Sequence, residues 1–126
     1  MRDRMTLYEA VGGSVTFERL LDAFYSEVAK DPILRPLYPA DLTDSQRYLT
    51  LFLTQYFGGP GTYSEERGHP RLRMRHMHLR IGQTERDAWL SHMFAALDGL
   101  ELPEPAREEI RHYFGGAATF LINHAE

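Results

Sequence analysis

Apolar residues recur at spacings of three and four along most of the chain, which is the repeat of one face of an α-helix. The segment of residues 15–30 shows this repeat most clearly, and its apolar residues are Phe17, Leu20, Leu21, Phe24 and Val28. Valine and isoleucine are few, and no sustained alternation of apolar and polar residues indicates a strand. The sequence therefore predicts an all-α domain of four main helices joined by short turns.

Capping and turn residues divide the first half of the chain. Gly12-Gly13 is expected to end a short first helix, and Ser14 is expected to cap the long helix that follows. Thr43 and Gln46 match a capping box, in which the threonine is the N-cap and the glutamine reaches back to it. The helix that this box begins is expected to continue to Phe57.

The second half of the chain contains longer irregular stretches. Residues 58–69 are expected to form a loop, apart from one possible helical turn at residues 64–67. A short helix is predicted over residues 70–76, because it opens with a proline, whose missing N–H costs nothing in a first turn. Another helix is expected to start at Thr84, and the last one at a pair of prolines that begins with Pro103.

Length and composition exclude several classes of protein. The 126 residues are enough for one domain, which we expect to span residues 1–126. The chain has no cysteine, which excludes disulfides, zinc fingers and iron–sulfur clusters. The net charge of −4 argues against nucleic acid as a partner. We expect a cytoplasmic protein, since no stretch is apolar enough for a signal peptide or a membrane span.

The segment from Gly68 to Ile81 is the most unusual part of the sequence, since it contains three histidines and four arginines. In a helix over residues 70–76, Leu72 and Arg73 would share a face with His76. A neutral imidazole on an apolar face beside arginines suits an iron ligand next to a cofactor that carries carboxylates. The segment is equally compatible with a core histidine in a basic surface loop.

Other kinds of active site find little support in the sequence. The chain contains no GxSxG elbow and no phosphate-binding loop of the Walker type. His76 and His78 would point to different sides of a helix. A metal site that folding assembles from histidines and carboxylates remains an alternative.

Several pieces of the chain, in this order and spacing, resemble the group II (O-type) truncated haemoglobins of bacteria and plants. The matching pieces are Leu7–Gly13, Phe24-Tyr25, Leu37–Pro39, Gln55–Pro60, Tyr63-Ser64, Arg67–His76 and Arg86–Leu90. Nearly the whole sequence is covered, up to about Asn123. The resemblance implies a truncated globin fold, which is a two-over-two α-helical sandwich.

The resemblance also implies a haem b cofactor, iron protoporphyrin IX, with a single proximal histidine. His76 matches this iron ligand, because it closes the Arg-x-Arg-His run of the family. Arg75 resembles the residue that pairs with a haem propionate, and Arg73 and Arg71 are further candidates for that role. His69 is expected to cap the short helix instead.

On the ligand side of the haem, the resemblance assigns hydrogen-bond donors to Tyr25, Tyr38 and Trp89. The helical pattern independently places Tyr25 at the edge of its helix face. Ser45 matches the distal position that faces the ligand, where a small side chain leaves room for the other donors. The further haem contacts that we expect are Leu49, Phe52, Tyr56, Ile81, Met93 and Phe114.

The chain departs from the family pattern just after the expected iron ligand. His78-Leu79 stands where the family often has a Pro-Phe pair. Loss of the phenyl ring is expected to loosen the packing of the haem, and His78 adds a titratable group nearby.

The resemblance implies a protein that binds dioxygen, carbon monoxide, nitric oxide or peroxide. Three donors around the ligand favour slow release, and hence nitric oxide oxidation or peroxidase-like activity over simple oxygen transport. Such reactions need a reductase, which the sequence does not identify, and the protein is expected to be a monomer or a homodimer. Two alternatives are a ligand sensor or electron-transfer module with the same pocket, and a haem-free helical interaction domain that uses the arginine cluster.

Overall fold

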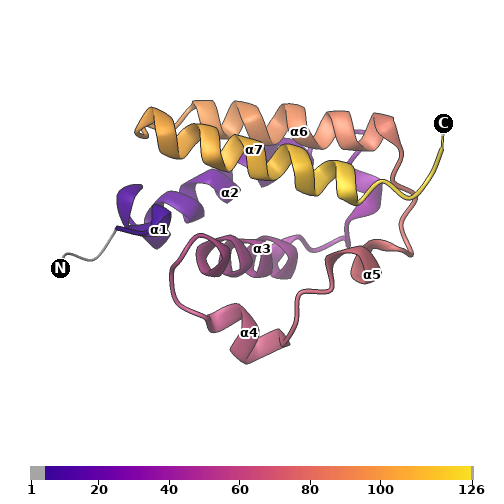
Figure 1. Cartoon of the computed structure of the whole chain (residues 1–126). Coiled ribbons are helices and arrows are strands. Elements are labelled where there is room, and N and C mark those ends of the chain that lie inside the picture. The colour runs from indigo at the N-terminus through magenta and orange to yellow at the C-terminus, as the bar shows by residue number, and fades with distance from the viewer. Residues whose placement is uncertain (1–4, 126) are drawn as a thin grey trace.

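The structure, a computed structural model, describes residues 5–125 and is all-helical over them (Figure 1). The α-helices of this part are α1 (Leu7–Ala10), α2 (Ser14–Val28), α3 (Thr43–Tyr56), α4 (Thr62–Arg67), α5 (Leu72–His76), α6 (Gln83–Asp98) and α7 (Glu104–Phe120). One turn of 3-10 helix, η1 (Arg35–Leu37), lies between α2 and α3. The prediction of an all-α fold is confirmed. None of the described helices has both the length and the apolar composition that crossing a bilayer requires.

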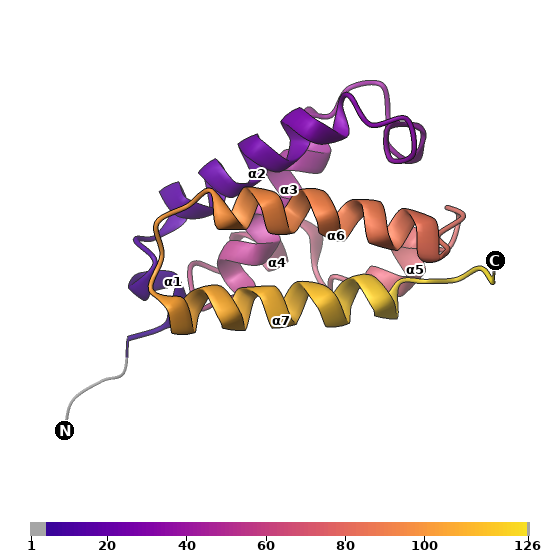
Figure 2. The same cartoon turned by 90° about the horizontal axis from the view of Figure 1, so that it is seen from above.

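The four long helices form two pairs, α2 with α3 and α6 with α7, as the two-over-two prediction requires. Helices α6 and α7 lie side by side and run in opposite directions, and α2 packs against both α3 and α6 (Figure 2). Helix α4 lies on the far side of α3 from this upper pair, and α5 lies near the C-terminal end of α7 (Figure 1). The space between α3, α5 and α6 is therefore bounded by helices from three different parts of the sequence.

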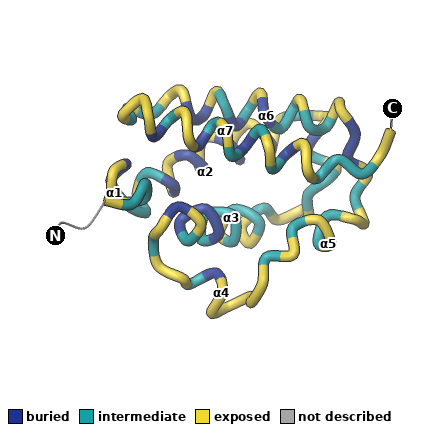
Figure 3. Tube along the Cα trace, in the orientation of Figure 1, coloured by how far each residue is buried: buried dark blue, intermediate teal, exposed yellow. Residues whose placement is uncertain are grey.

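The core lies where the inner faces of these helices meet (Figure 3). The predicted apolar face of α2 is buried throughout, and each of its five residues is at most 1% exposed. Met93 of α6 and Phe114 of α7 complete the centre of the core. Burying one such side chain stabilises the fold by about 1.5–3 kcal/mol, so this face fixes the place of α2.

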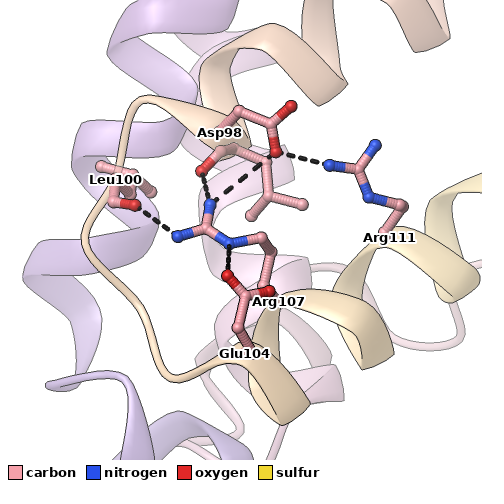
Figure 4. A network of polar contacts seen from close by, with 6 residues as sticks. Asp98, Leu100, Glu104, Arg107 and Arg111 are labelled. Carbon is pink, nitrogen blue, oxygen red and sulfur yellow. Dashed lines mark hydrogen bonds and ion pairs between the residues drawn. The ribbon is translucent and has the colours of Figure 1, made fainter.

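Arg107 fastens the connection between α6 and α7. Its guanidinium donates Nη1 to Leu97 O at 2.7 Å and Nη2 to Leu100 O at 2.8 Å. The same group lies 3.4 Å from the Glu104 carboxylate, and Asp98 adds a second carboxylate on the other side (Figure 4). Leu97 lies in the last turn of α6 and Leu100 in the loop that follows, so these bonds fasten the end of α6 to the start of α7.

Two predicted helix caps are wrong. Thr43 is the first residue of α3 rather than its N-cap, and its N–H donates to Asp41 Oδ1 at 2.9 Å. Gln46 does not reach back to it, because its side chain donates to Asp22 of α2 at 2.5 Å. Ser14 is the first residue of α2, where no side chain caps the helix. The Asp41 carboxylate and the hydrogen bond from Gln46 to Asp22 therefore replace the expected capping box.

The structure also changes the predicted boundaries in the second half. The expected loop over residues 58–69 contains the whole of α4, which is longer than the single turn that was expected. Helix α5 begins at Leu72 and not at Pro70, because Arg71 between them is left-handed with φ 47°. Helix α6 starts one residue earlier than predicted, at Gln83.

Candidate functional site

Two adjoining cavities of about 420 and 220 Å³ lie between α3, α5 and α6. They share six lining residues, namely Tyr38, Ser45, Arg67, Arg75, His76 and Trp89. Five of these six are residues that the sequence analysis placed at the site. We call the two together the central cavity, because their common lining makes them parts of one space.

His76 is the last residue of α5, and its ring is held in one orientation. Its Nδ1 lies 2.6 Å from the carbonyl oxygen of Leu72, one turn earlier in the same helix. A carbonyl oxygen can only accept, so Nδ1 carries the hydrogen in this bond, and in the neutral ring Nε2 is then the nitrogen with the lone pair. An imidazole fixed in this tautomer by a backbone carbonyl is a typical metal ligand. The predicted face shared by Leu72 and His76 is thus present.

Asn123 braces the segment that follows His76. Its amide nitrogen donates to the carbonyl oxygens of His76 at 3.3 Å and Leu79 at 2.9 Å. Its amide oxygen accepts from the Ile81 N–H at 2.9 Å. These three bonds tie a five-residue helix and the loop after it to the end of α7, which a short helix needs because it is marginal alone.

Tyr25, Tyr38 and Trp89 meet on the other side of the cavity, and each comes from a different element. The rings of Tyr25 and Tyr38 pack edge to face with centroids 5.7 Å apart. The Tyr38 oxygen accepts hydrogen bonds from the Trp89 indole and the Tyr25 hydroxyl. Because the Tyr38 oxygen already accepts twice, its own O–H is the group left to donate.

Burial keeps both phenols protonated. It raises the pKa of Tyr38 to about 12, although the hydrogen bonds from Trp89 and Tyr25 to its oxygen oppose this change. Burial also raises the pKa of Tyr25 far above its usual value, and the neighbouring Tyr38 adds to the increase. Near neutral pH both hydroxyls are therefore hydrogen-bond donors in surroundings with little water.

Two guanidinium groups line the central cavity beside His76. Arg75 donates Nε to Pro70 O at 2.8 Å, which holds its side chain along the loop before α5. Arg67 lies over the ring of Tyr48 with its guanidinium carbon 4.3 Å from the ring centroid. Guanidinium groups bind carboxylates with two parallel hydrogen bonds, so this wall of the cavity suits a ligand with acidic groups.

The remaining predicted contacts divide into two groups. Ile81, Leu49 and Phe52 line the central cavity. Arg73, Arg71 and Tyr56 line a separate groove, while Met93 and Phe114 are buried in the core without lining the cavity. Arg73 faces away from the cavity because its Nη1 donates to Phe120 O at 2.7 Å.

Residues that the sequence analysis did not assign also line the cavity. Arg67, Tyr48, Tyr63 and Glu85 are among them. Arg67 and Tyr63 belong to pieces of the family pattern, which gave a signal for them, whereas Tyr48 and Glu85 carry none. His69 accepts the Arg71 N–H on Nδ1 at 3.0 Å, just before α5 begins. The structure brings no three histidines or carboxylates of residues 5–125 together as a metal site, which was the alternative assembly.

Comparisons with known proteins agree with this geometry. The family model for a bacterial-like globin matches residues 6–122. The haemoglobin of Chloroflexus aurantiacus is 55% identical, with TM-score 0.94, over 96% of this chain and 100% of that one. The group II truncated haemoglobin of Bacillus anthracis is 42% identical, with TM-score 0.95, over 99% and 96%. The truncated oxygen-avid haemoglobin of Bacillus subtilis is 43% identical, with TM-score 0.87, over 94% and 100%.

An all-helical two-over-two fold, enclosing a cavity with one fixed imidazole, defines the chain as a globin. Within that class it belongs to the bacterial-like globin family, and it is a group II truncated haemoglobin. As a globin it binds haem, and through the haem it binds oxygen and other diatomic ligands.

Proposed function

We propose that the central cavity holds haem b, with His76 as the iron ligand through Nε2 and Arg75 and Arg67 facing the propionates. The observation that carries this proposal is the hydrogen bond from His76 Nδ1 to Leu72 O, which leaves Nε2 free. The lining fits the group, since it combines the oriented imidazole of His76, two guanidiniums and aromatic or aliphatic walls, with His78 as a second imidazole. Bound there, the haem supplies an iron that binds diatomic ligands and exchanges electrons.

Tyr38, Tyr25 and Trp89 act on the ligand as hydrogen-bond donors. Tyr38 donates directly, because its oxygen already accepts from Trp89 and Tyr25 and its hydrogen is free. A fixed donor in a dry cavity would strengthen the binding of a diatomic ligand that gains negative charge when it is bound there. Ser45 lines the same cavity with a small side chain, which would leave room for the ligand. We therefore propose slow ligand release, which the description of the Bacillus subtilis relative as oxygen-avid also supports.

Slow release favours redox chemistry over oxygen transport. Nitric oxide and dioxygen would combine to give nitrate with one electron drawn from the bound group, so a reductase would have to return that electron. Aromatic rings connect the cavity with the core: Phe24 lies 5.2 Å from both Tyr25 and Trp89, and Phe114 lies 5.5 Å from Trp89 between ring centroids. Such side chains can pass electrons, which makes peroxidase-like activity the second candidate reaction. A chain without cysteine fits a reducing compartment, and we propose the cytoplasm.

The test of the haem assignment is the visible absorption spectrum of the purified protein in the ferric, ferrous and carbon monoxide forms. We expect an intense Soret band that shifts with carbon monoxide. In His76→Gly the haem should be lost or altered, and added imidazole should restore the spectrum. A His76→Gly protein with an unchanged spectrum would exclude His76 as the ligand.

The two candidate reactions are tested separately. Mixing the dioxygen complex with nitric oxide should produce nitrate in equal amount, faster than the dioxygen dissociates. Mixing the ferric protein with peroxide should oxidise an added phenol faster than free haem does. If neither reaction is faster than its control, the protein binds ligands without this chemistry.

A further inference from the structure

A second hollow in the protein lies outside the central cavity. It is a groove of about 810 Å³ between the end of α3, the segment of residues 69–74 and one face of α7. It shares only Phe52 and Leu72 with the central cavity, so these two side chains form the wall between the spaces. The haem site proposed above does not use it.

The groove is lined mainly by apolar side chains that solvent reaches. Tyr56, Met74 and Phe120 line it and are 55%, 57% and 55% exposed. They are three of the seven exposed large hydrophobic residues of the described chain. Contiguous exposed apolar surface is uncommon on a monomeric protein and marks a binding site. Its volume also falls in the range of small-molecule sites, which is about 300–1,000 Å³.

A missing side chain helps to form the hollow. Gly116 of α7 lines the groove, and a Cβ built on it would have no atom within 4 Å. Gly115 beside it is equally open but does not line the groove. Glycine in a helix interior destabilises the helix by comparison with alanine. The two positions therefore offer a matched pair of sites, one inside the groove and one outside it.

The charged side chains of the groove carry a net positive charge. Arg71 and Arg73 line it, and Glu109 is the one carboxylate of the lining. Arg73 is already held by its bond to Phe120 O, which leaves Arg71 as the guanidinium without a side-chain partner among residues 5–125. An unpaired guanidinium beside an apolar hollow is complementary to one carboxylate that carries an apolar chain.

We propose that this groove binds a small amphipathic carboxylate of the medium-chain fatty acid class. The apolar chain lies against Tyr56, Tyr113 and Phe120, and the carboxylate is bound by Arg71. The rings of Tyr56 and Tyr113 lie against each other with centroids 4.2 Å apart and planes tilted by 36°, and they give the chain an aromatic surface to pack on. A neutral hydrocarbon would make no hydrogen bond with the Arg71 guanidinium. The groove should therefore prefer an apolar chain that carries a carboxylate.

Calorimetric titration of the carbon monoxide complex with decanoate tests this proposal. Carbon monoxide occupies the iron, so a carboxylate cannot bind there, and the Soret band should not move. We expect saturable binding of decanoate. Decanol, which has the same chain length, should bind at least about tenfold more weakly. Equal binding of decanol and decanoate would overturn the role of the carboxylate.

Three variants locate the site. Gly116→Trp fills the groove and should weaken decanoate binding about tenfold or more, whereas Gly115→Trp on the same helix should bind as the wild type does. Arg71→Glu should weaken decanoate but not decanol. Circular dichroism and the Soret band establish that each variant is folded. Undiminished binding in Gly116→Trp would overturn the location. A dimer in sedimentation that only Gly116→Trp dissociates would instead identify a second copy of the chain as the occupant, which would also overturn the proposal.

Discussion

The Nε2 atom of His92 lies 2.6 Å from Oδ2 of Asp31, and this hydrogen bond joins α6 to the corner that carries Tyr38. The other carboxylate oxygen of Asp31 accepts from the backbone N–H groups of Ile33 at 2.6 Å and Leu34 at 3.1 Å. The hydrogen bond from His92 lowers the pKa of Asp31, which keeps the carboxylate charged. One side chain thus fixes the turn before η1 and fastens it to α6.

This pair sets the position of Tyr38 relative to Trp89. His92 follows Trp89 by three residues in α6, and Tyr38 follows Asp31 by seven. Arg35 fastens the other end of the corner by donating to Pro39 O at 2.9 Å and to Ala40 O at 2.7 Å. We therefore expect His92 to control ligand release without touching the ligand, because it holds the donor that does.

The first prediction concerns His92→Leu. Dioxygen should dissociate about fivefold faster, which corresponds to the ~1 kcal/mol of one hydrogen bond. His92→Gln keeps a donor in place of Nε2 and should restore the wild-type rate. Stopped-flow displacement of dioxygen by carbon monoxide measures the rate, and the carbon monoxide stretching frequency reports the polarity at the ligand.

The control for this prediction is His112→Leu, which alters an exposed histidine of α7 and should leave the rate unchanged. In a Tyr38→Phe background, His92→Leu should have no further effect on release, because its action passes through the Tyr38 hydroxyl. An equal effect in both backgrounds would show that His92 acts by another route.

The second prediction separates the two tyrosines. Tyr38→Phe removes the hydroxyl that donates to the ligand, and dioxygen release should accelerate by about 5- to 150-fold, as expected for a buried donor worth about 1–3 kcal/mol. Tyr25→Phe removes only a donor to Tyr38, so its effect should be several-fold smaller. The same displacement experiment measures both. A larger effect of Tyr25→Phe would mean that Tyr25, and not Tyr38, contacts the ligand.

The helical pattern predicted α2 well because its apolar residues at spacings of three and four are all buried. Burial of one helix face therefore explains each of these residues. It failed for α4, where Tyr63 is the one buried residue of six and leaves no repeat to detect. The start of α5 could not be predicted either, since the left-handed Arg71 is a conformation that arginine seldom adopts.

The residues of the site could also be predicted only in part from the sequence. His76, Tyr25, Tyr38 and Trp89 came from a resemblance, and the structure brings all four to one cavity. Arg73 was grouped with Arg75, but residues two apart on a helix point to nearly opposite sides. The brace by Asn123 joins residues 42 to 47 positions apart, and no local pattern contains that information.

The third prediction concerns alkaline pH. Burial raises the pKa of Tyr38 and of Tyr113 to about 12, while unfolded tyrosines ionise near pH 10. Below pH 10 both states keep these protons, so the two groups do not change the stability. Between about pH 10 and 12 the unfolded state loses protons that the folded state retains, and the free energy of unfolding must fall as the pH rises.

Urea denaturation of the carbon monoxide complex at several pH values tests this expectation. Tyr113→Phe should show a shallower fall above pH 10 than the wild type, with little change in pH dependence below it. Tyr113 suits the test because it lies outside the central cavity. If the free energy of unfolding of the variant fell as steeply with pH as that of the wild type, folding would not raise the pKa of Tyr113.

The last prediction concerns Asn123, which holds the loop after His76 by three side-chain hydrogen bonds. Asn123→Ala leaves the Ile81 N–H and the carbonyls of His76 and Leu79 without these partners, at a cost of about 1–3 kcal/mol. Because that loop follows the iron ligand directly, haem should be lost about fivefold faster or more, as measured by its transfer to an acceptor apoprotein. Ser91→Ala, on the exposed side of α6, is the control and should lose haem at the wild-type rate. If Asn123→Ala unfolded more easily yet lost haem at the wild-type rate, the brace would support the fold without holding His76 in place.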